Sequence, residues 1–232
     1  MNFSAKLSLI GEFCFWYDQC MPNPTAAELK NRYKAAKKVL NKAFPEATTA
    51  LNYKNPFELL IATIMSAQCT DVLVNKVTAT LFKKYKSPAD FAKANLTTLT
   101  KDIYPVTFYR NKAKSIKKTA QIIEKRYNGN VPRTLEQLIE LPGVARKTAN
   151  VVLGHAYNIP SGFVVDTHVK RVTKRLGLTK NEDPKKVEQD LIKIVPKEDW
   201  VKFADQLILF GRKYCTARND KCEINGIKLI HY

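Results

Sequence analysis

Apolar residues recur every three or four positions along most of the chain, the spacing that places side chains on one face of an α-helix. In segment 26–44, Leu29 and Leu40 belong to such a face, and lysines occupy the other. Segment 57–67 is apolar nearly all round and follows Pro56. It is therefore predicted to be a buried central helix that begins at this proline.

Capping residues and helix-breaking residues divide the rest of the chain into further helices. These are predicted over residues 71–85, a short stretch around 91, 96–101, 111–127, 135–141, 145–157, 166–176, 184–195 and 200–213. No segment alternates convincingly between apolar and polar residues, so the predicted fold class is all-α.

The charge of the chain narrows its possible partners. Its 232 residues include 39 Lys+Arg and 21 Asp+Glu, a net charge of +18. This balance favours nucleic acid or an anionic membrane surface as a partner. The alternative is a lysine-rich protein whose charge only keeps it in solution. With 45% hydrophobic residues a core is expected, and no apolar run is long enough to span a membrane.

The N-terminal segment and the cysteines indicate in which cellular compartment the protein is expected. Gly11 and Glu12 interrupt the apolar stretch near the N-terminus, so residues 1–24 are predicted to be an N-terminal extension rather than a secretory signal. The five cysteines are odd in number, so we expect reduced thiols and no disulfide framework. We expect a cytoplasmic, nucleoid-associated protein.

Residues 141–150 predict a hairpin between two helices, turned by Pro142 and Gly143. The free N–H groups at the start of the second helix are suited to bind a phosphate. An ordinary closed hairpin carries equal weight on this spacing alone. Lys147 lies in the first turn of the second helix. A lysine that is desolvated there releases its proton more readily and can act as a nucleophile or Schiff-base former. The alternative is a further phosphate contact.

Asp166, nineteen residues after Lys147, opens the next predicted helix within the run Val-Asp-Thr-His-Val of residues 165–169. An aspartate there caps the helix by accepting hydrogen bonds from free backbone N–H groups. A carboxylate held rigidly in this way can also serve chemistry.

These segments together resemble the helix–hairpin–helix DNA glycosylases, and among them most closely the endonuclease III family. The resemblance runs from about Ala26 to Cys222. Its motifs lie at residues 66–71, 108–109, 130–132, 141–150, 165–169 and 210–212. It implies two helical domains with a DNA-binding cleft between them. The implied units are the extension at 1–24, a six-helix barrel with the hairpin at 50–159, and a second domain from 25–49 plus 160–232.

The resemblance also implies a chemistry. Lys147 would attack the anomeric carbon of a damaged nucleotide, the base would leave, and β-elimination from a Schiff base would break the strand. Asp166 would stabilise positive charge on the sugar or help deprotonate Lys147. The implied activity is a glycosylase and AP lyase for oxidised pyrimidines in duplex DNA, acting as a monomer on damaged or abasic sites.

Several residues are implied to contact the DNA. The target nucleotide must leave the base stack, and Gln68 resembles the side chain that the family inserts into the gap. Phe108 matches a second wedge, with a core aromatic as the alternative. The remaining predicted contacts are Gly143, Ala145, Arg146, Thr148 and Arg218. Ala145 replaces a glycine of many relatives, so its backbone must avoid positive φ.

The C-terminal cysteines depart from the family. Its four-iron cluster takes four cysteines in the pattern C-x6-C-x2-C-x5-C, and this chain has Cys215 and Cys222 at the first two positions, then Asn225 and His231. Such clusters take four thiolates. We therefore expect no cofactor and a degenerate loop at 215–232, with a zinc site that includes His231 as the alternative.

Two other functions remain as alternatives. A monofunctional mismatch or adenine glycosylase would keep Asp166, but such relatives generally lack the lysine at position 147. A non-catalytic helix–hairpin–helix DNA-binding protein would not require the pair of Lys147 and Asp166.

Overall fold

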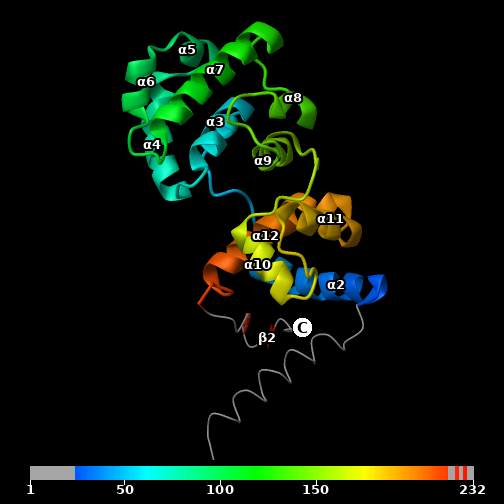
Figure 1. Cartoon of the computed structure of the whole chain (residues 1–232). Helices are drawn as coiled ribbons and strands as arrows, with labels where there is room; N and C mark the ends of the chain where they lie inside the picture. Colours follow the sequence, from blue (N-terminus) through cyan, green and yellow to red (C-terminus); the bar gives the residue numbers. More distant parts are fainter. Residues whose placement is uncertain (1–23, 219–222, 225–226, 229–232) are drawn as a thin grey trace, which may run out of the picture.

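The computed structural model describes residues 24–218, 223–224 and 227–228. Figure 1 shows its helices in two lobes, one above the other. The upper lobe contains α3 (Pro56–Ser66), α4 (Asp71–Lys84), α5 (Pro88–Lys93), α6 (Leu96–Asp102), α7 (Tyr109–Tyr127), α8 (Leu135–Ile139) and α9 (Arg146–Tyr157). The lower lobe contains α2 (Ala26–Ala43), α10 (Thr167–Arg175), α11 (Pro184–Ile194), the 3-10 helix η1 (Lys197–Asp199) and α12 (Trp200–Lys213). The predicted all-α fold is confirmed.

Two two-residue strands, β1 (Glu223–Ile224) and β2 (Ile227–Lys228), pair antiparallel near the end of the chain. None of the helices in the described residues has the length and apolar character that a membrane span requires.

Each lobe has its own hydrophobic core. The core of the upper lobe takes its buried side chains from Leu51 to Leu153, and the core of the lower lobe takes them from α2 and from the chain after α9. The lower lobe is thus built from segments on both sides of the upper one, and α2 packs on α11 and α12. We propose that the two cores correspond to the predicted domains, 50–159 and 25–49 plus 160–232.

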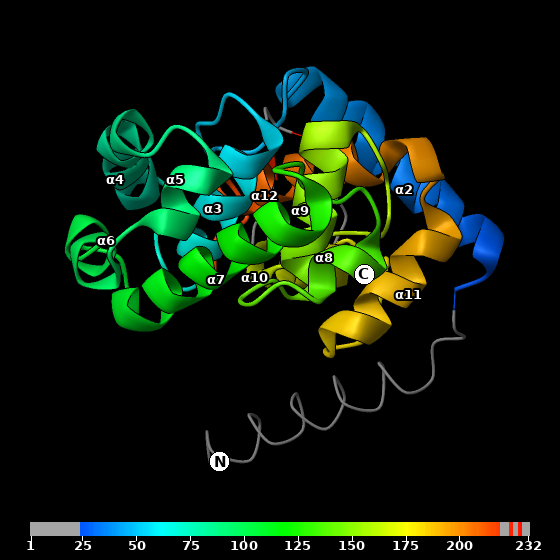
Figure 2. The same cartoon turned by 90° about the horizontal axis from the view of Figure 1, so that it is seen from above.

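Helix α3 is the buried centre of the upper lobe, as predicted from its apolar sequence. The Asn55 side chain caps it by accepting the Glu58 N–H at 2.9 Å, and Pro56 occupies the first turn, where a missing N–H costs nothing. Eight of its eleven residues are buried. Figure 2 shows it between α4, α9 and α12 when the molecule is viewed from above. The helix ends at the cleft between the lobes.

The bounds of two neighbouring helices differ from the predicted ones. Helix α8 ends at Ile139 rather than 141, because the chain turns there into the hairpin. Helix α7 begins at Tyr109 rather than 111, and its N-cap residue Phe108 has a left-handed backbone with φ of 55°. Aromatic residues rarely adopt this conformation, so propensity alone predicts a later start.

Two ion pairs join the lobes across the cleft, Arg212–Asp71 at 2.7 Å and Arg146–Glu188 at 3.1 Å. A third contact places the His155 ring 3.4 Å from the Asp205 carboxylate. Helices α9 and α12 pack closely where Gly154 meets Val201. A Cβ added to Gly154 would lie only 2.8 Å from Val201 Cγ2. The lobes are therefore held together by direct packing as well as by charge.

Candidate active site

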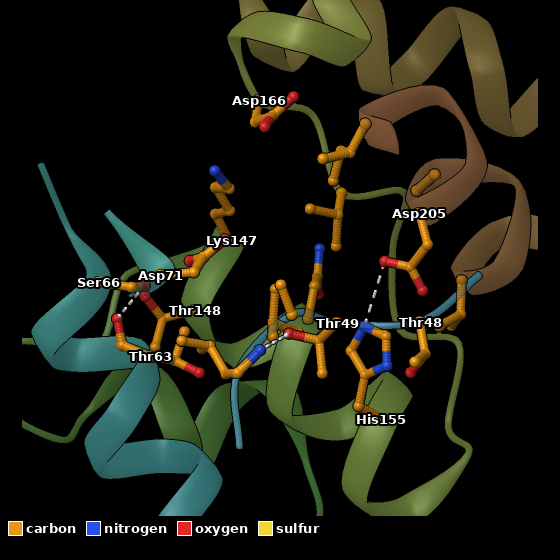
Figure 3. Close-up of a pocket in the computed structure, with 18 of the residues that line it drawn as sticks. Thr48, Thr49, Thr63, Ser66, Asp71, Lys147, Thr148, His155, Asp166 and Asp205 are labelled. Carbon is orange, nitrogen blue, oxygen red and sulfur yellow. Dashed lines mark hydrogen bonds and ion pairs between the residues drawn. The ribbon is translucent and has the colours of Figure 1, made fainter. Parts of the chain in front are cut away.

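A cavity opens between the two lobes, and both contribute to its walls. The upper lobe contributes Thr63, Ser66, Ala67, Gln68, Asp71, Lys147, Thr148, Asn150, Val151 and His155, and the lower lobe contributes Val164, Asp166, Val201, Ala204, Asp205, Ile208, Leu209 and Arg212. Residues 48–51, on the connection between the lobes, complete the lining. In Figure 3 the Lys147 side chain points across the cavity toward Asp166. The fold therefore brings the predicted lysine and aspartate to one cavity.

The hairpin that carries Lys147 is turned by Gly143, whose φ is 80°. A residue with a Cβ would be strained in this conformation, and that Cβ would also lie 3.0 Å from Ser115 Cβ. Thr119 of α7 donates its hydroxyl to the Pro142 carbonyl at 2.9 Å. The turn is thus anchored to the body of the lobe, and Lys147 projects, exposed, from the first turn of α9.

Helix α9 begins without a side-chain cap. Its N-cap residue Ala145 has φ of −88° and ψ of 167°, so it avoids positive φ, as expected. Because alanine offers no acceptor, no side chain of the N-cap residue satisfies the first N–H groups of the helix. These N–H groups are placed to bind an anion.

Asp166 is the N-cap residue of α10, as predicted. Its Oδ1 accepts the Val169 N–H at 2.8 Å, which holds the carboxylate in place. Burial lowers the pKa of His168, two residues later, although Asp166 opposes this shift. The acid at the cavity wall is thus held in place by the backbone of α10.

A polar cluster joins α9 to the segment that leads to Asp166. Arg146 donates through Nε and Nη2 to the two carboxylate oxygens of Glu188, each at 3.1 Å. Ser161 donates to Asn150 Oδ1 at 2.9 Å. Between these two pairs lies Gly162, where a Cβ would come within 2.4 Å of Glu188 and 2.5 Å of Asn150. The cluster therefore ties α9, which carries Lys147, to α11 and to residues 161–162 of the chain that leads to Asp166.

The two predicted wedge residues lie on turns with the same unusual backbone. Gln68 and Phe108 both have φ of 55°, and both are exposed, Phe108 to 59%. An exposed phenylalanine at a strained position is not a core residue, so the alternative of a core aromatic is wrong. Strain of this kind persists only where the surrounding structure enforces it.

The other predicted DNA contacts are distributed unevenly. Thr148 lines the cavity, and Gly143, Ala145 and Arg218 are exposed outside it. Arg146 is the first residue of α9, next to the hairpin, but its guanidinium donates hydrogen bonds to Glu188.

The sequence interpretation missed the cavity residues His155 and Asp205, and it missed that Asp71 and Arg212, which lie in two of the family motifs, pair with each other. Their partners lie far away along the chain, so no local pattern marks them.

In this two-lobed helical protein of net charge +18, a lysine at the start of α9 faces an acid across the cavity, an arrangement that fits the class of helical DNA glycosylases. The model of the family described as HhH-GPD superfamily base excision DNA repair protein matches residues 61–197. The chain belongs to this family.

Named relatives agree with this assignment. Endonuclease III of Synechocystis sp. is 47% identical over 196 residues, which cover 84% of this chain and 90% of that protein. Endonuclease III of Bacillus subtilis is 50% identical over 180 residues, which cover 77% and 82%. A solved non-covalent endonuclease III–DNA complex superposes with a TM-score of 0.79 at 46% identity, covering 83% of this chain and 90% of that one. A trapped endonuclease III–DNA covalent intermediate gives the same TM-score and identity.

Taken together, the family and these relatives make the chain a bifunctional enzyme of base excision repair, a DNA glycosylase with AP lyase activity.

The expectation of no cofactor is contradicted, because endonuclease III relatives 42–50% identical to this chain carry a four-iron–four-sulfur cluster. The residues present here do not match that cluster's four-thiolate set. Cys215 is buried at the end of α12 with Arg175 Nη1 3.2 Å from its sulfur, and Cys222, Asn225 and His231 lie outside the described residues. Two cysteines provide half of the thiolates that such a cluster takes.

The state of the thiols also differs from expectation at one position. Cys215 is disulfide-bonded in the structure, so the prediction of reduced thiols is wrong there. Cys69 is the free cysteine of the described residues.

Proposed function

We propose that Lys147 is the nucleophile and Asp166 the stabilising acid of a glycosylase that removes oxidised pyrimidines from duplex DNA. The observation that carries this proposal is their meeting across one interlobe cavity, although they lie nineteen residues apart in sequence (Figure 3). The cavity can receive a nucleotide only after that nucleotide has left the base stack.

In the proposed reaction, the free amine of Lys147 forms a bond to the anomeric carbon of the damaged nucleotide. The glycosidic bond breaks, and the base leaves with its electron pair and takes up a proton. Opening of the sugar ring yields a Schiff base between Lys147 and the sugar. Loss of a proton from the neighbouring sugar carbon then expels the 3′ phosphate and breaks the strand.

Asp166 acts on the charge that develops on the sugar. Its cap bond to Val169 occupies Oδ1, and the carboxylate faces Lys147 across the cavity (Figure 3). A carboxylate already held at that place stabilises an oxocarbenium-like centre without reorganising during the reaction. The same group can accept a proton from the Lys147 ammonium as the amine becomes the nucleophile.

The DNA backbone is proposed to lie on the hairpin and to be held by charge. The free N–H groups after Ala145 and the exposed turn at Gly143 suit a phosphate, with Thr148 beside them and Arg218 as a separate electrostatic contact. Gln68 and Phe108 would fill the gap left by the extruded nucleotide. The net charge of +18 also supports association with nucleoid DNA.

Borohydride trapping on a duplex with one abasic site tests the assignment of the nucleophile. The wild-type protein is expected to form a covalent complex, and Lys147→Ala is expected to form none. Lys170→Ala, a lysine of α10 paired with Glu182, is the control and should trap normally. Trapping by Lys147→Ala at the wild-type level would exclude Lys147 as the nucleophile.

Excision from duplexes that each carry one modified base tests the substrate class. Release of an oxidised pyrimidine at least about 10-fold faster than release of an oxidised purine supports the proposal. The reverse preference contradicts it.

A further inference from the structure

Lys112 is a buried lysine that the proposed reaction does not use. It lies in the first turn of α7, is 7% exposed, and among the lysines and arginines of the described residues it alone is buried. Long basic side chains are almost never fully buried without a partner. A specific role is therefore expected for it.

The partners of Lys112 are backbone carbonyls of the last turn of α3 and the residue after it. Its Nζ donates to Met65 O at 2.7 Å and to Ala67 O at 2.5 Å. The last carbonyls of a helix have no partner within the helix, and a cation there is favoured by the helix dipole. Lys112 thus closes the C-terminus of α3. Burial lowers its pKa, and the nearby Cys69 opposes this shift.

The residue that follows Ala67 is Gln68, the first of the two left-handed wedge positions. Because Lys112 holds the carbonyls of Met65 and Ala67, it sets the direction in which the chain leaves α3. The backbone of Gln68 is thereby fixed from one side by a side chain of another helix.

The main chain of Lys112 contacts the second wedge position. Its N–H donates to Phe108 O at 3.1 Å, the first hydrogen bond of α7. Phe108 has no side-chain cap bond of its own. One residue therefore bonds both strained turns, through its side chain to the Gln68 turn and through its backbone to the Phe108 turn.

We propose that Lys112 is a positioning residue that holds Gln68 and Phe108 in register, so that both can enter the duplex when the damaged nucleotide leaves it. This inference rests on the proposed function, because it requires these two side chains to act on DNA. It predicts that Lys112 matters for opening a base-paired target and does not matter for the lysine chemistry itself.

The test compares two substrates with Lys112→Met, which keeps the length of the side chain and removes its donors. The first substrate is a fully paired duplex with one oxidised thymine. The second is a single strand with one abasic site, which has no partner strand to separate and no gap to fill. Excision from the duplex is expected to fall about 10- to 100-fold, the loss that a displacement of about 1 Å produces. Strand cleavage at the single-stranded site should change less than about 3-fold.

Lys117→Met is the matched control. Lys117 lies one and a half turns further along α7, and its Nζ donates at 2.6 Å to Ala94 O, the C-cap carbonyl of α5. The variant removes the same kind of contact at a place with no wedge residue. It should cleave both substrates at the wild-type rate. Lys112→Arg, which retains donors, is expected to recover part of the duplex activity.

A double-mutant cycle with Gln68→Ala separates positioning from a general loss of structure. If Lys112 acts through the wedge, adding Lys112→Met to Gln68→Ala should cost much less than it costs alone. Additive losses, an equal loss on both substrates, or wild-type duplex activity in Lys112→Met would each overturn the inference. Should Lys112→Met not fold, Lys112→Gln is measured by the same criteria.

Different results would contradict the proposed function and the role of Lys112. If the wild-type protein neither traps an abasic site nor excises an oxidised pyrimidine, the proposed function fails. If it does both and Lys112→Met behaves like Lys117→Met, only the role of Lys112 fails.

Discussion

Asp166 caps α10 and is proposed to act on the sugar, and one substitution can separate these two roles. As an N-cap residue it stabilises α10 through the Val169 N–H, and as an anion it is proposed to stabilise charge on the sugar. Asparagine caps a helix about as well as aspartate but carries no charge. The charge can therefore be removed while the cap remains.

Asp166→Asn is expected to keep the wild-type melting temperature and to lower the single-turnover rate of base excision about 100- to 1000-fold, the typical cost of removing one preorganised electrostatic group. Asp166→Ala should lose a similar amount of activity and also about 1 kcal/mol of stability, because the cap is lost. Equal excision rates in Asp166→Asn and the wild-type protein would contradict the electrostatic role.

Single residues also show where sequence interpretation stops. Lys112 lies in the helix predicted over residues 111–127, and its lysine side chain gives no sign of burial. Lys112, Ile116, Thr119 and Ile123 are all buried and recur at helical spacing, so this spacing was the available signal. Helical spacing cannot predict which groups Lys112 contacts, because Met65 and Ala67, whose carbonyls accept its hydrogen bonds, lie more than forty residues earlier.

At the scale of elements, the start of α9 shows how function and stability compete. Ala145 has the extended backbone of an N-cap residue but no side-chain acceptor. A capping side chain would satisfy the free N–H groups that are proposed to hold a phosphate. The uncapped helix is thus less stable than it could be.

Ala145→Asp is expected to stabilise the free protein by about 0.5–2 kcal/mol and to weaken binding to an abasic-site duplex. The carboxylate would take the N–H groups and repel the phosphate. Ala145→Ser should stabilise similarly with a smaller loss of affinity. Calorimetry and fluorescence anisotropy measure the two effects. Unchanged DNA affinity in Ala145→Asp would remove the hairpin from the phosphate contacts.

Helix α2 is anchored to the lower lobe through a carboxylate that depends on pH. The Asp199 carboxylate accepts hydrogen bonds from Tyr33 and Lys37 of α2. Burial alone would raise the pKa of Asp199, but the bonds from Lys37 and Tyr33 outweigh it, and the pKa is lowered. A carboxyl group whose pKa is lower in the folded state stabilises the fold above its unfolded pKa, near 3.9.

This contribution should be complete above about pH 5 and lost as the pH falls below about 4 toward the folded pKa. We therefore expect Asp199→Asn to lower the urea midpoint at pH 7, with the difference from wild type shrinking below pH 4. Asp183→Asn, which keeps the cap of α11, is the control and should change little. A difference that stays constant from pH 7 to pH 3 would contradict the assignment.

Over the whole molecule, the net charge of +18 governs association with DNA. Each phosphate contact releases condensed counterions, so the logarithm of the binding constant falls linearly with the logarithm of salt concentration. The exposed Arg218 follows α12, and the exposed Lys30 belongs to the first turns of α2. In Figure 1 the end of α12 and the start of α2 lie at opposite ends of the lower lobe.

Arg218→Ala is expected to reduce the slope of that salt dependence by about 1, the value of a single lost phosphate contact. Lys30→Ala should leave it unchanged. Binding isotherms between 50 and 200 mM salt provide the measurement. Equal slopes for Arg218→Ala and wild type would show that Arg218 does not contact a phosphate.

The sequence by itself determined the helical class, the central helix α3, the hairpin and the cap at Asp166. These depend on residues within a few positions of one another, where periodicity and cap chemistry act. The family motifs also identified the lysine and the aspartate.

Only the tertiary structure decided the contacts between residues that are far apart in the sequence. The pairing of Arg146 with Glu188, the close approach at Gly162 and the two carbonyls held by Lys112 join residues 12 to 47 positions apart. The first two contacts join the upper lobe to the lower one, and the third joins two helices of the upper lobe. In each case side chains find partners that no local pattern specifies. The lysine and the aspartate are local features, but the cavity in which they meet belongs to the assembled molecule.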